Sequence, residues 1–201
     1  MSEQLYRSPF HRGLWRDAAQ RLKDVRMLAI CAMFIALHVA LGAVFIPVGE
    51  NLRIYFTFFI SALGASVYGP ILALLEGLLS DLIGCIVAPS GPFFPGYTLS
   101  AMLGSLIYAL FFFHQRQSVL RIFLCKLLVN VLVNIVLGSL WSAMLMGKAY
   151  LYYMAKSIVK NLLLLPLETA VMTLIFHTMN PLLARMKLAP RQPPLFKKKT
   201  E

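Results

Sequence analysis

Several side chains that could bind a small molecule lie in or beside apolar stretches of this sequence. Asp81 offers a carboxylate, which can accept two parallel hydrogen bonds from an aminopyrimidinone edge such as a pterin presents. Arg53, Lys156 and Lys160 offer positive charge for ligand carboxylates. Flat rings that could stack on a fused heteroaromatic ring come from Phe93, Phe94, Tyr97 and Trp141. Together these side chains suit a flat, polar, anionic ligand.

Asparagines add to this set. Lys126, Asn130 and Asn134 recur at intervals of four, so they share one stripe of a helix. Such a stripe in a membrane must face protein or water, and hydrogen bonding between helices is an equal alternative to ligand contact for Asn130. We assign Asn134 to the ligand site, together with Asn161.

Other ionisable groups are not assigned to the ligand. Glu76 and Glu168 are expected deeper in the membrane, where pairing with a lysine or with backbone groups is as probable as ligand contact. His38 lies in the first apolar stretch, and its isolation favours a packing role. The sequence predicts no catalytic residues.

The amino-acid composition indicates the class of protein in which these residues lie. Of the 201 residues, 59% are hydrophobic and 13% are charged, which is far outside the range of soluble domains. A chain of this length could hold about six membrane-spanning helices and no separate soluble domain. The three cysteines lie singly in apolar stretches, so we expect neither disulfides nor a metal site, and no cofactor.

The sequence therefore predicts an all-α integral membrane protein with six transmembrane helices. The predicted spans cover residues 27–46, 54–68, 71–87, 97–113, 119–145 and 154–183. They divide the chain into a basic N-terminal segment (1–26), a membrane domain (27–183) and a basic tail (184–201). Gly69 and Pro70 predict a tight hairpin between the second and third spans.

The basic residues predict the orientation of the spans. The formal net charge is +11, and the bases gather in both terminal segments and at Arg116 and Arg121. The loops on the opposite side of the membrane contain only two basic residues, Arg53 and Lys148. This asymmetry predicts cytoplasmic termini by the positive-inside rule and gives no reason to expect a nucleic-acid partner. Residues 14–26 predict a basic amphipathic helix on the inner leaflet.

This orientation places three irregular segments, 47–53, 88–96 and 146–153, on the outer face. The middle one contains three prolines and two glycines, so it is stiff and cannot be helical. It could form a lid or stacking wall over a ligand, or simply a membrane-surface turn with interfacial aromatic residues. In the first span, Ala32, Ala36 and Ala40 form a stripe of small residues that permits close contact with another helix.

Short motifs connect these features to a known family. They are LRIYF at 52–56, YGP at 68–70, SDLIG at 80–84, PSGPFFPGYTLSA at 89–101 and KNLLLLPLE at 160–168. Over residues 27–180 the sequence resembles the folate-family S components of energy-coupling factor (ECF) vitamin transporters. The choice of folate within this family depends mainly on the long proline- and glycine-rich loop and on the LRI segment.

The resemblance implies a fold, a function and partners. It implies the six-helix S-component fold in a bacterial cell membrane, with an outward-facing folate site capped by loops. It also implies that the alanine stripe docks the ECF T subunit, and that two ECF ATPase subunits supply energy. The absence of a G-x-x-x-x-G-K-[ST] loop agrees with ATP hydrolysis by partners. Alternatives are an S component for riboflavin, thiamine or pantothenate, or a small membrane enzyme, for which H-E-x-x-H and G-x-S-x-G motifs are missing.

Overall fold

The computed structural model describes residue 5 and residues 11–49, 52–89, 93–147, 149–190 and 192–193, with the backbone alone for 45–49 and 52–54. The described chain is mainly helical. Its helices are α1 (Arg12–Arg21), α2 (Val25–Gly42), α3 (Phe58–Tyr68), α4 (Pro70–Val87), α5 (Pro95–Phe112), α6 (Val119–Val129), the π-helix η1 (Asn130–Leu137), α7 (Gly138–Met146) and α8 (Tyr150–Arg185). An antiparallel hairpin of β1 (Phe45–Gly49) and β2 (Leu52–Tyr55) joins α2 to α3.

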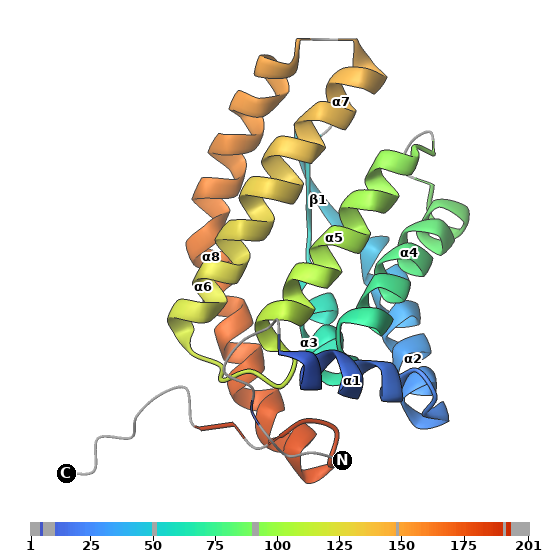
Figure 1. Ribbon diagram of the computed structural model, residues 1–201. Helices are drawn as coiled ribbons and strands as arrows, with labels where there is room; N and C mark the ends of the chain where they lie inside the picture. The colour runs from blue at the N-terminus through green and yellow to red at the C-terminus, as the bar shows by residue number, and fades with distance from the viewer. Residues whose placement is uncertain are drawn as a thin grey trace, which may run out of the picture.

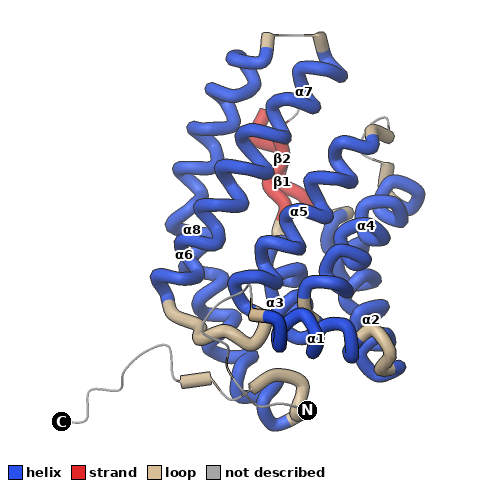
Figure 2. Tube along the Cα trace, in the orientation of Figure 1, coloured by secondary structure: helices blue, strands red, loops and turns tan. Residues whose placement is uncertain are grey.

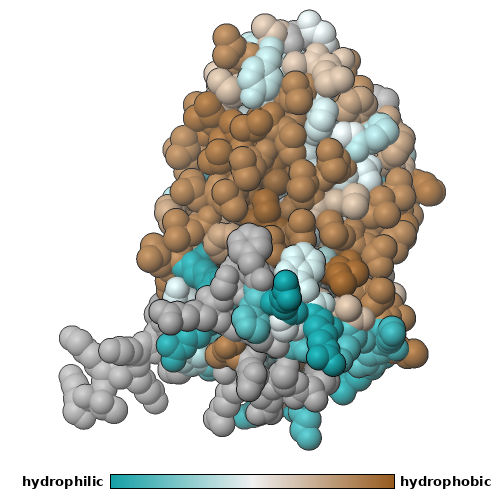
Figure 3. Space-filling view, viewed as in Figure 1, coloured by the Kyte–Doolittle hydropathy of each residue, from teal (hydrophilic) through white to brown (hydrophobic). Residues whose placement is uncertain are grey.

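Five helical segments are long and apolar enough to cross a membrane. They are α2, α4, α5, the 28-residue run from α6 through η1 to α7, and α8. Hydrophobic side chains cover most of the visible flank of these helices, while hydrophilic ones gather near α1 (Figure 3). The predicted helical membrane fold is confirmed.

The second predicted span has a different structure. Its first residues belong to β2, and only the 11-residue α3 follows. At 1.5 Å per residue α3 is about 16 Å long, roughly half the hydrocarbon thickness of a bilayer. α2 also ends early, at Gly42, and Pro47, which has no N–H to continue a helix, pairs with Arg53 in the hairpin. The predicted second span, residues 54–68, is therefore the end of a hairpin followed by a helix of about half the membrane thickness.

The predicted turn between α3 and α4 is confirmed. Gly69 has φ +83°, a left-handed conformation that favours glycine, and Pro70 begins α4. A Cβ on Gly69 would lie 2.9 Å from the Phe113 ring, so the turn also needs a residue without a side chain. Gly147, with φ +71°, similarly ends α7. α8 begins at Tyr150, so the last predicted outer loop is shorter than 146–153.

Two groups of helices pack together (Figure 1). α4 and α5 make the most extensive helix contact, with α2 against α4 and α3 against α5, while the run from α6 to α7 packs along α8. Contacts of α5 with η1 and of α3 with α8 join the groups. The core includes Tyr68, Phe112, Met172 and Phe176. The hairpin extends from the α3 region toward the end opposite α1 (Figure 2).

α1 lies across one end of the bundle (Figure 1). Its Leu14 and Ala18 side chains are fully buried against Phe113, with Ile71 packed beside them. The side of this amphipathic helix that carries Leu14 and Ala18 therefore faces the protein, because the ends of α4 and α5 offer an apolar surface at this level. Contact of the helix with the inner leaflet stays a prediction.

Arg21, in the last turn of α1, ties this end together. Its guanidinium donates to the carbonyl oxygens of Val67 and Leu188 and lies 2.9 Å from Nε2 of His114. It also lies over the Phe113 ring, 5.0 Å from the centroid. Burial lowers the pKa of Arg21 to about 10, so the side chain stays charged at neutral pH.

Candidate ligand site

The candidate site lies at the end of the bundle opposite α1. The last turns of α4 and α7 and the first turns of α5 and α8 lie at this end (Figure 1), and a ring contact of Phe94 with Trp141 joins the start of α5 to α7. α3 fills the bundle interior only from the α1 end to about mid-height, because it begins at Phe58 and its last turn contacts Arg21. At the site end the hairpin takes the place of a helix.

Asp81 is held by a neighbouring hydroxyl. Thr98, on α5, donates from Oγ1 to Oδ2 of Asp81 at 2.6 Å. Thr98 is buried, whereas Asp81 is partly exposed. A carboxylate has about four acceptor positions, so this bond orients Asp81 and leaves capacity for a second partner.

Three of the predicted aromatic residues form one cluster, which we call the aromatic cluster. The Phe94 ring lies 5.6 Å from that of Trp141 and 6.1 Å from that of Tyr97. Nε1 of Trp141 donates to Ser100 Oγ at 2.9 Å, and the Tyr97 hydroxyl lies 3.2 Å from Ser142 Oγ. Because both polar tips are hydrogen-bonded, the ring faces have defined orientations.

The amide residues form a hydrogen-bonded network between η1 and α8. Nδ2 of Asn134 donates to Oδ1 of Asn130 at 2.9 Å and to Oδ1 of Asn161 at 3.3 Å. Asn161 donates to Oγ of Ser157 at 3.0 Å, and Ser157 donates to the Asn134 carbonyl. Asn130 and Asn161 are buried, while Asn134 is partly exposed. Asn134 is therefore the member best placed to meet a ligand, and π-helical segments such as η1 are frequent at functional sites.

The other predicted ligand residues have different surroundings. The Phe93 side chain is 54% exposed, and the ring pairs of the aromatic cluster do not include it. Nζ of Lys156 lies 4.4 Å from the centroid of Tyr152, and Lys160 is partly buried beside Asn161 on α8. Arg53 lies in β2 rather than in a helix, and its side chain is outside what the structure describes.

Glu168 is paired with a lysine. The sequence had left open whether this carboxylate pairs within the protein or contacts the ligand. Its Oε1 lies 3.3 Å from Nζ of Lys126, and its Oε2 accepts from Nδ2 of Asn130 at 3.0 Å. Nζ of Lys126 also lies 4.2 Å from the centre of the Phe58 ring. Asn130 therefore bonds between helices, from η1 to α8.

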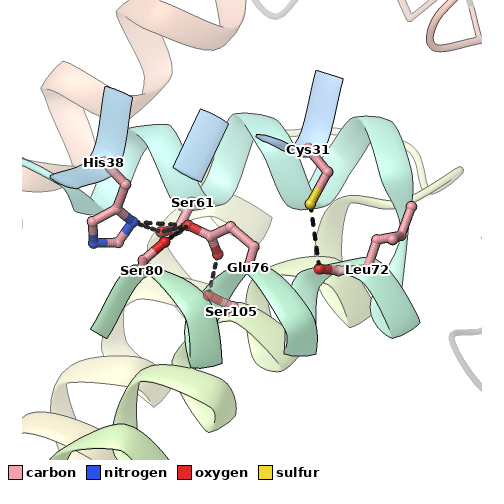
Figure 4. A network of polar contacts seen from close by, with 7 residues as sticks. All are labelled: Cys31, His38, Ser61, Leu72, Glu76, Ser80 and Ser105. Carbon is pink, nitrogen blue, oxygen red and sulfur yellow. Dashed lines mark hydrogen bonds and ion pairs between the residues drawn. The ribbon is translucent and has the colours of Figure 1, made fainter. Parts of the chain in front are cut away.

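Glu76 is the centre of a buried polar network (Figure 4). Its Oε1 lies 2.8 Å from Nδ1 of His38 and accepts from Ser61 at 3.1 Å and Ser80 at 3.4 Å, while its Oε2 accepts from Ser105 at 2.7 Å. The network connects α2, α3, α4 and α5 around a side chain with no exposed surface. Glu76 therefore acts in the bundle interior.

Sequence reasoning missed the hydroxyl residues that hold the site. They are Thr98, Ser100, Ser142 and Ser157. Two of them lie in the first two turns of α5, and Ser157 precedes Asn161 by one turn of α8. The only feature of the sequence that could have identified them is a hydroxyl residue within an apolar helix. Gly96 was also missed: a Cβ there would lie 2.4 Å from the Phe94 ring and 2.6 Å from the Trp141 ring.

Metal-binding groups do not gather in the described part of the chain. No three His, Cys, Asp or Glu side chains among those residues are placed to hold a metal ion. Cys31, Cys85 and Cys125 are all unpaired thiols. The site geometry thus consists of hydrogen-bonding groups and aromatic rings.

Comparison with known proteins relates this arrangement to transporters. Two curated relatives are named folate transporter FolT. One, from Clostridium novyi, is 33% identical over 150 residues, covering 75% of this chain and 87% of that protein. The other, from Leuconostoc mesenteroides, is 34% identical over 155 residues, covering 74% and 83%.

A solved structure and a family model agree with this result. The structure, titled "Crystal structure of FolT bound with folic acid", matches with a TM-score of 0.69 and 28% identity, covering 74% of this chain and 91% of that one. The sequence model described as "ECF transporter, substrate-specific component" matches residues 26–176. The chain belongs to the family of substrate-specific (S) components of ECF transporters.

Proposed function

We propose that this chain is a folate-binding S component, which captures folate from outside a bacterial cell. The observation that carries the proposal is an oriented carboxylate, Asp81, held from the same turn of α5 that carries Tyr97 of the aromatic cluster. Thr98, which holds Asp81, directly follows Tyr97 of that cluster in the first turn of α5. The pterin ring of folate combines a flat face with an aminopyrimidinone edge, so it can stack and donate two hydrogen bonds at once.

The relatives support folate over other vitamins. Both curated relatives carry folate in their names, and the solved structure contains folic acid according to its title. In this chain we assign Asp81, Phe93, Phe94, Tyr97 and Trp141 to the ring system. Asn134 and Asn161 are assigned to polar groups of the ligand, and Arg53, Lys156 and Lys160 to its carboxylates.

The orientation follows from the charges. α1 carries Arg12, Arg16 and Arg21, and the end of α8 carries Arg185, which places basic residues at the end of the bundle opposite the site. By the positive-inside rule that end is cytoplasmic, so the site opens outward.

The exposed face of α2 is proposed to dock the T subunit. Ala32, Ala36 and Ala40 are all exposed, as are Met33 at 62% and Leu37 at 48%. Exposed small residues at four-residue spacing allow the backbone of another helix to approach closely. The T subunit would in turn connect the chain to two ECF ATPase subunits, which would supply the energy for transport.

Ligand titration of the purified chain tests the proposal. Folate, riboflavin, thiamine and pantothenate are titrated separately while Trp fluorescence and thermal stability are followed. We expect only folate to quench the fluorescence and raise the melting temperature. A response to another vitamin would overturn the substrate, and conversion of a ligand to a product would overturn the binding-protein class.

The two tryptophans provide an internal control for this titration. Trp141 belongs to the aromatic cluster, whereas Trp15 lies in α1 at the other end of the bundle. Folate should still quench a Trp15→Phe variant and should no longer quench a Trp141→Phe variant. Equal quenching in both variants would place the ligand elsewhere.

A further inference from the structure

His38 lies on the side of α2 that faces the protein, yet its side chain is partly open. Met27, Cys31, Ile35 and His38 follow helical spacing along one face. The first three are 1%, 4% and 7% exposed, whereas the His38 side chain is 23% exposed. Packing inside the bundle therefore loosens at the height of His38.

The elements around His38 explain this opening. His38 lies about one turn before the end of α2 at Gly42, where the chain continues into the hairpin. α3 begins only at Phe58, so no part of this helix covers the bundle interior between Phe58 and the site end. Ser80 contacts the same Glu76 oxygen as His38, and the next residue along α4 is Asp81. His38 thus lies in the half of α2 nearer the candidate site, and its contacts lead through Glu76 and Ser80 to the turn of α4 that carries Asp81.

Within the described part of the chain, the imidazole ring of His38 is hydrogen-bonded at one edge only. Nδ1 lies 2.8 Å from Oε1 of Glu76 and 3.0 Å from Oγ of Ser61. Nε2 lies on the opposite edge of the ring, turned away from the Glu76 carboxylate (Figure 4).

Charge balance determines what Nε2 can do. Glu76 has no exposed surface, and His38 is its basic contact among the described residues, so the pair is best accommodated with no net charge. Because Ser61, Ser80 and Ser105 donate to Glu76, a hydrogen on its carboxyl group can point only toward Nδ1. Two arrangements then meet this condition: a carboxylate beside an imidazolium, or a protonated Glu76 that donates to Nδ1 of a neutral ring. In both arrangements Nε2 carries the hydrogen. The open edge of His38 is therefore a hydrogen-bond donor.

We propose that His38 is a further ligand-binding residue at the floor of the site, donating from Nε2 to a carbonyl oxygen or ring nitrogen of the bound ligand. Asp81 would accept from the ligand and His38 would donate to it, so the two side chains together select a ring with both donors and acceptors. This inference rests on the proposed binding function and adds a specificity-determining residue to it.

Two substitutions separate ligand contact from support of Glu76. In His38→Asn the amide nitrogen lies near the position of Nδ1, so the bond to Glu76 is retained and the donor toward the site is lost. In His38→Gln the amide nitrogen reaches the position of Nε2, so the donor is retained. We expect folate affinity to fall about ten-fold in His38→Asn and to stay within about three-fold of the wild type in His38→Gln.

The control is Ser105→Ala, which removes a donor to Glu76 on the side away from His38. It should lower the melting temperature without changing folate affinity. If His38→Asn bound folate as tightly as the wild type, or if affinity followed melting temperature across all three variants, the inference would be overturned.

A second measurement does not depend on the ligand's identity. In a chain whose three cysteines are replaced by alanine, His38→Cys should react with a water-soluble methanethiosulfonate reagent, while Ile35→Cys, one turn deeper, should not. An unreactive Cys at position 38 would overturn the inference. Failure of the wild type to bind folate, with position 38 reactive, would instead overturn the choice of folate.

Discussion

Two carboxylates five positions apart on α4 have different surroundings. Asp81 is partly exposed and has one hydroxyl donor, whereas Glu76 is fully buried and contacts three serines and His38. A carboxylate with free acceptor positions can bind a ligand, whereas one whose acceptor positions are all occupied by protein groups stabilises the fold.

We predict that Asp81→Asn weakens folate binding by about 10- to 100-fold, because a charge-assisted hydrogen bond contributes about 1.5–3 kcal/mol. Its melting temperature without ligand should stay close to that of the wild type. Isothermal titration calorimetry and thermal unfolding measure the two effects.

Glu76→Gln serves as the matched change and should lower the melting temperature more than Asp81→Asn, because an amide nitrogen cannot accept from the serine hydroxyls that donate to both oxygens of Glu76. Equal loss of affinity in both variants, with melting temperatures unchanged, would contradict this division of roles.

Gly96 controls the aromatic cluster through its lack of a side chain. A Cβ would enter the space of the Phe94 and Trp141 rings, so Gly96→Ala should displace both and weaken folate binding about ten-fold, the effect of overpacking by 1–3 kcal/mol. The Trp emission spectrum should also shift. Gly84→Ala, at a position with open space within 4 Å, should change neither quantity. The same affinity in both variants would refute the role of the cluster.

Among the helices, α2 shows the clearest difference between a face buried in the core and a face exposed at the surface. Its inner face carries Met27, Cys31 and Ile35 in the core, and its outer face exposes Ala32 and Ala36. A helix that presents small side chains outward at regular spacing is suited to a helix partner.

We predict that Ala36→Trp leaves folate affinity of the isolated chain unchanged and abolishes its assembly with the T subunit, because the indole separates the two helix backbones. Co-purification with the T and ATPase subunits, and folate uptake into vesicles, measure the effect. Leu163→Trp, on the exposed face of α8, is the matched control and should assemble normally. Loss of assembly in the control alone would move the docking surface to α8.

At the scale of the whole molecule, the two ends of the bundle differ in kind. The site end is built from elements within the family match of residues 26–176, whereas α1 and Leu188 lie outside it. Arg21 joins α1 to α3, to the segment after α5 and to the segment after α8.

We predict that Arg21→Met lowers the melting temperature by about 5 °C, since it loses buried charge-assisted hydrogen bonds worth about 2 kcal/mol. Folate affinity should be unchanged, because the site is at the other end. Arg16→Met, at an exposed position of the same helix, is the control and should melt like the wild type. A loss of affinity in Arg21→Met would show that the two ends are coupled.

The sequence alone determined the membrane class, the positions of five long helices and the turn at Gly69 and Pro70. These features depend on local properties: hydrophobic length, the missing N–H of proline and the conformational freedom of glycine. The site candidates Asp81, Phe94, Tyr97 and Trp141 could also be chosen from residue type.

The tertiary structure decided what depends on neighbours distant in the chain. The hairpin was missed because residues 47–53 were predicted to be an irregular outer loop, and only pairing between residues 45–49 and 52–55 satisfies their backbone groups as strands. The partners of Asp81, Trp141 and Glu76 come from other helices, so no spacing reveals them. Packing of α1 on the bundle, and the opening beside His38, likewise follow from which surfaces meet, which hydrophobic periodicity along the chain does not specify.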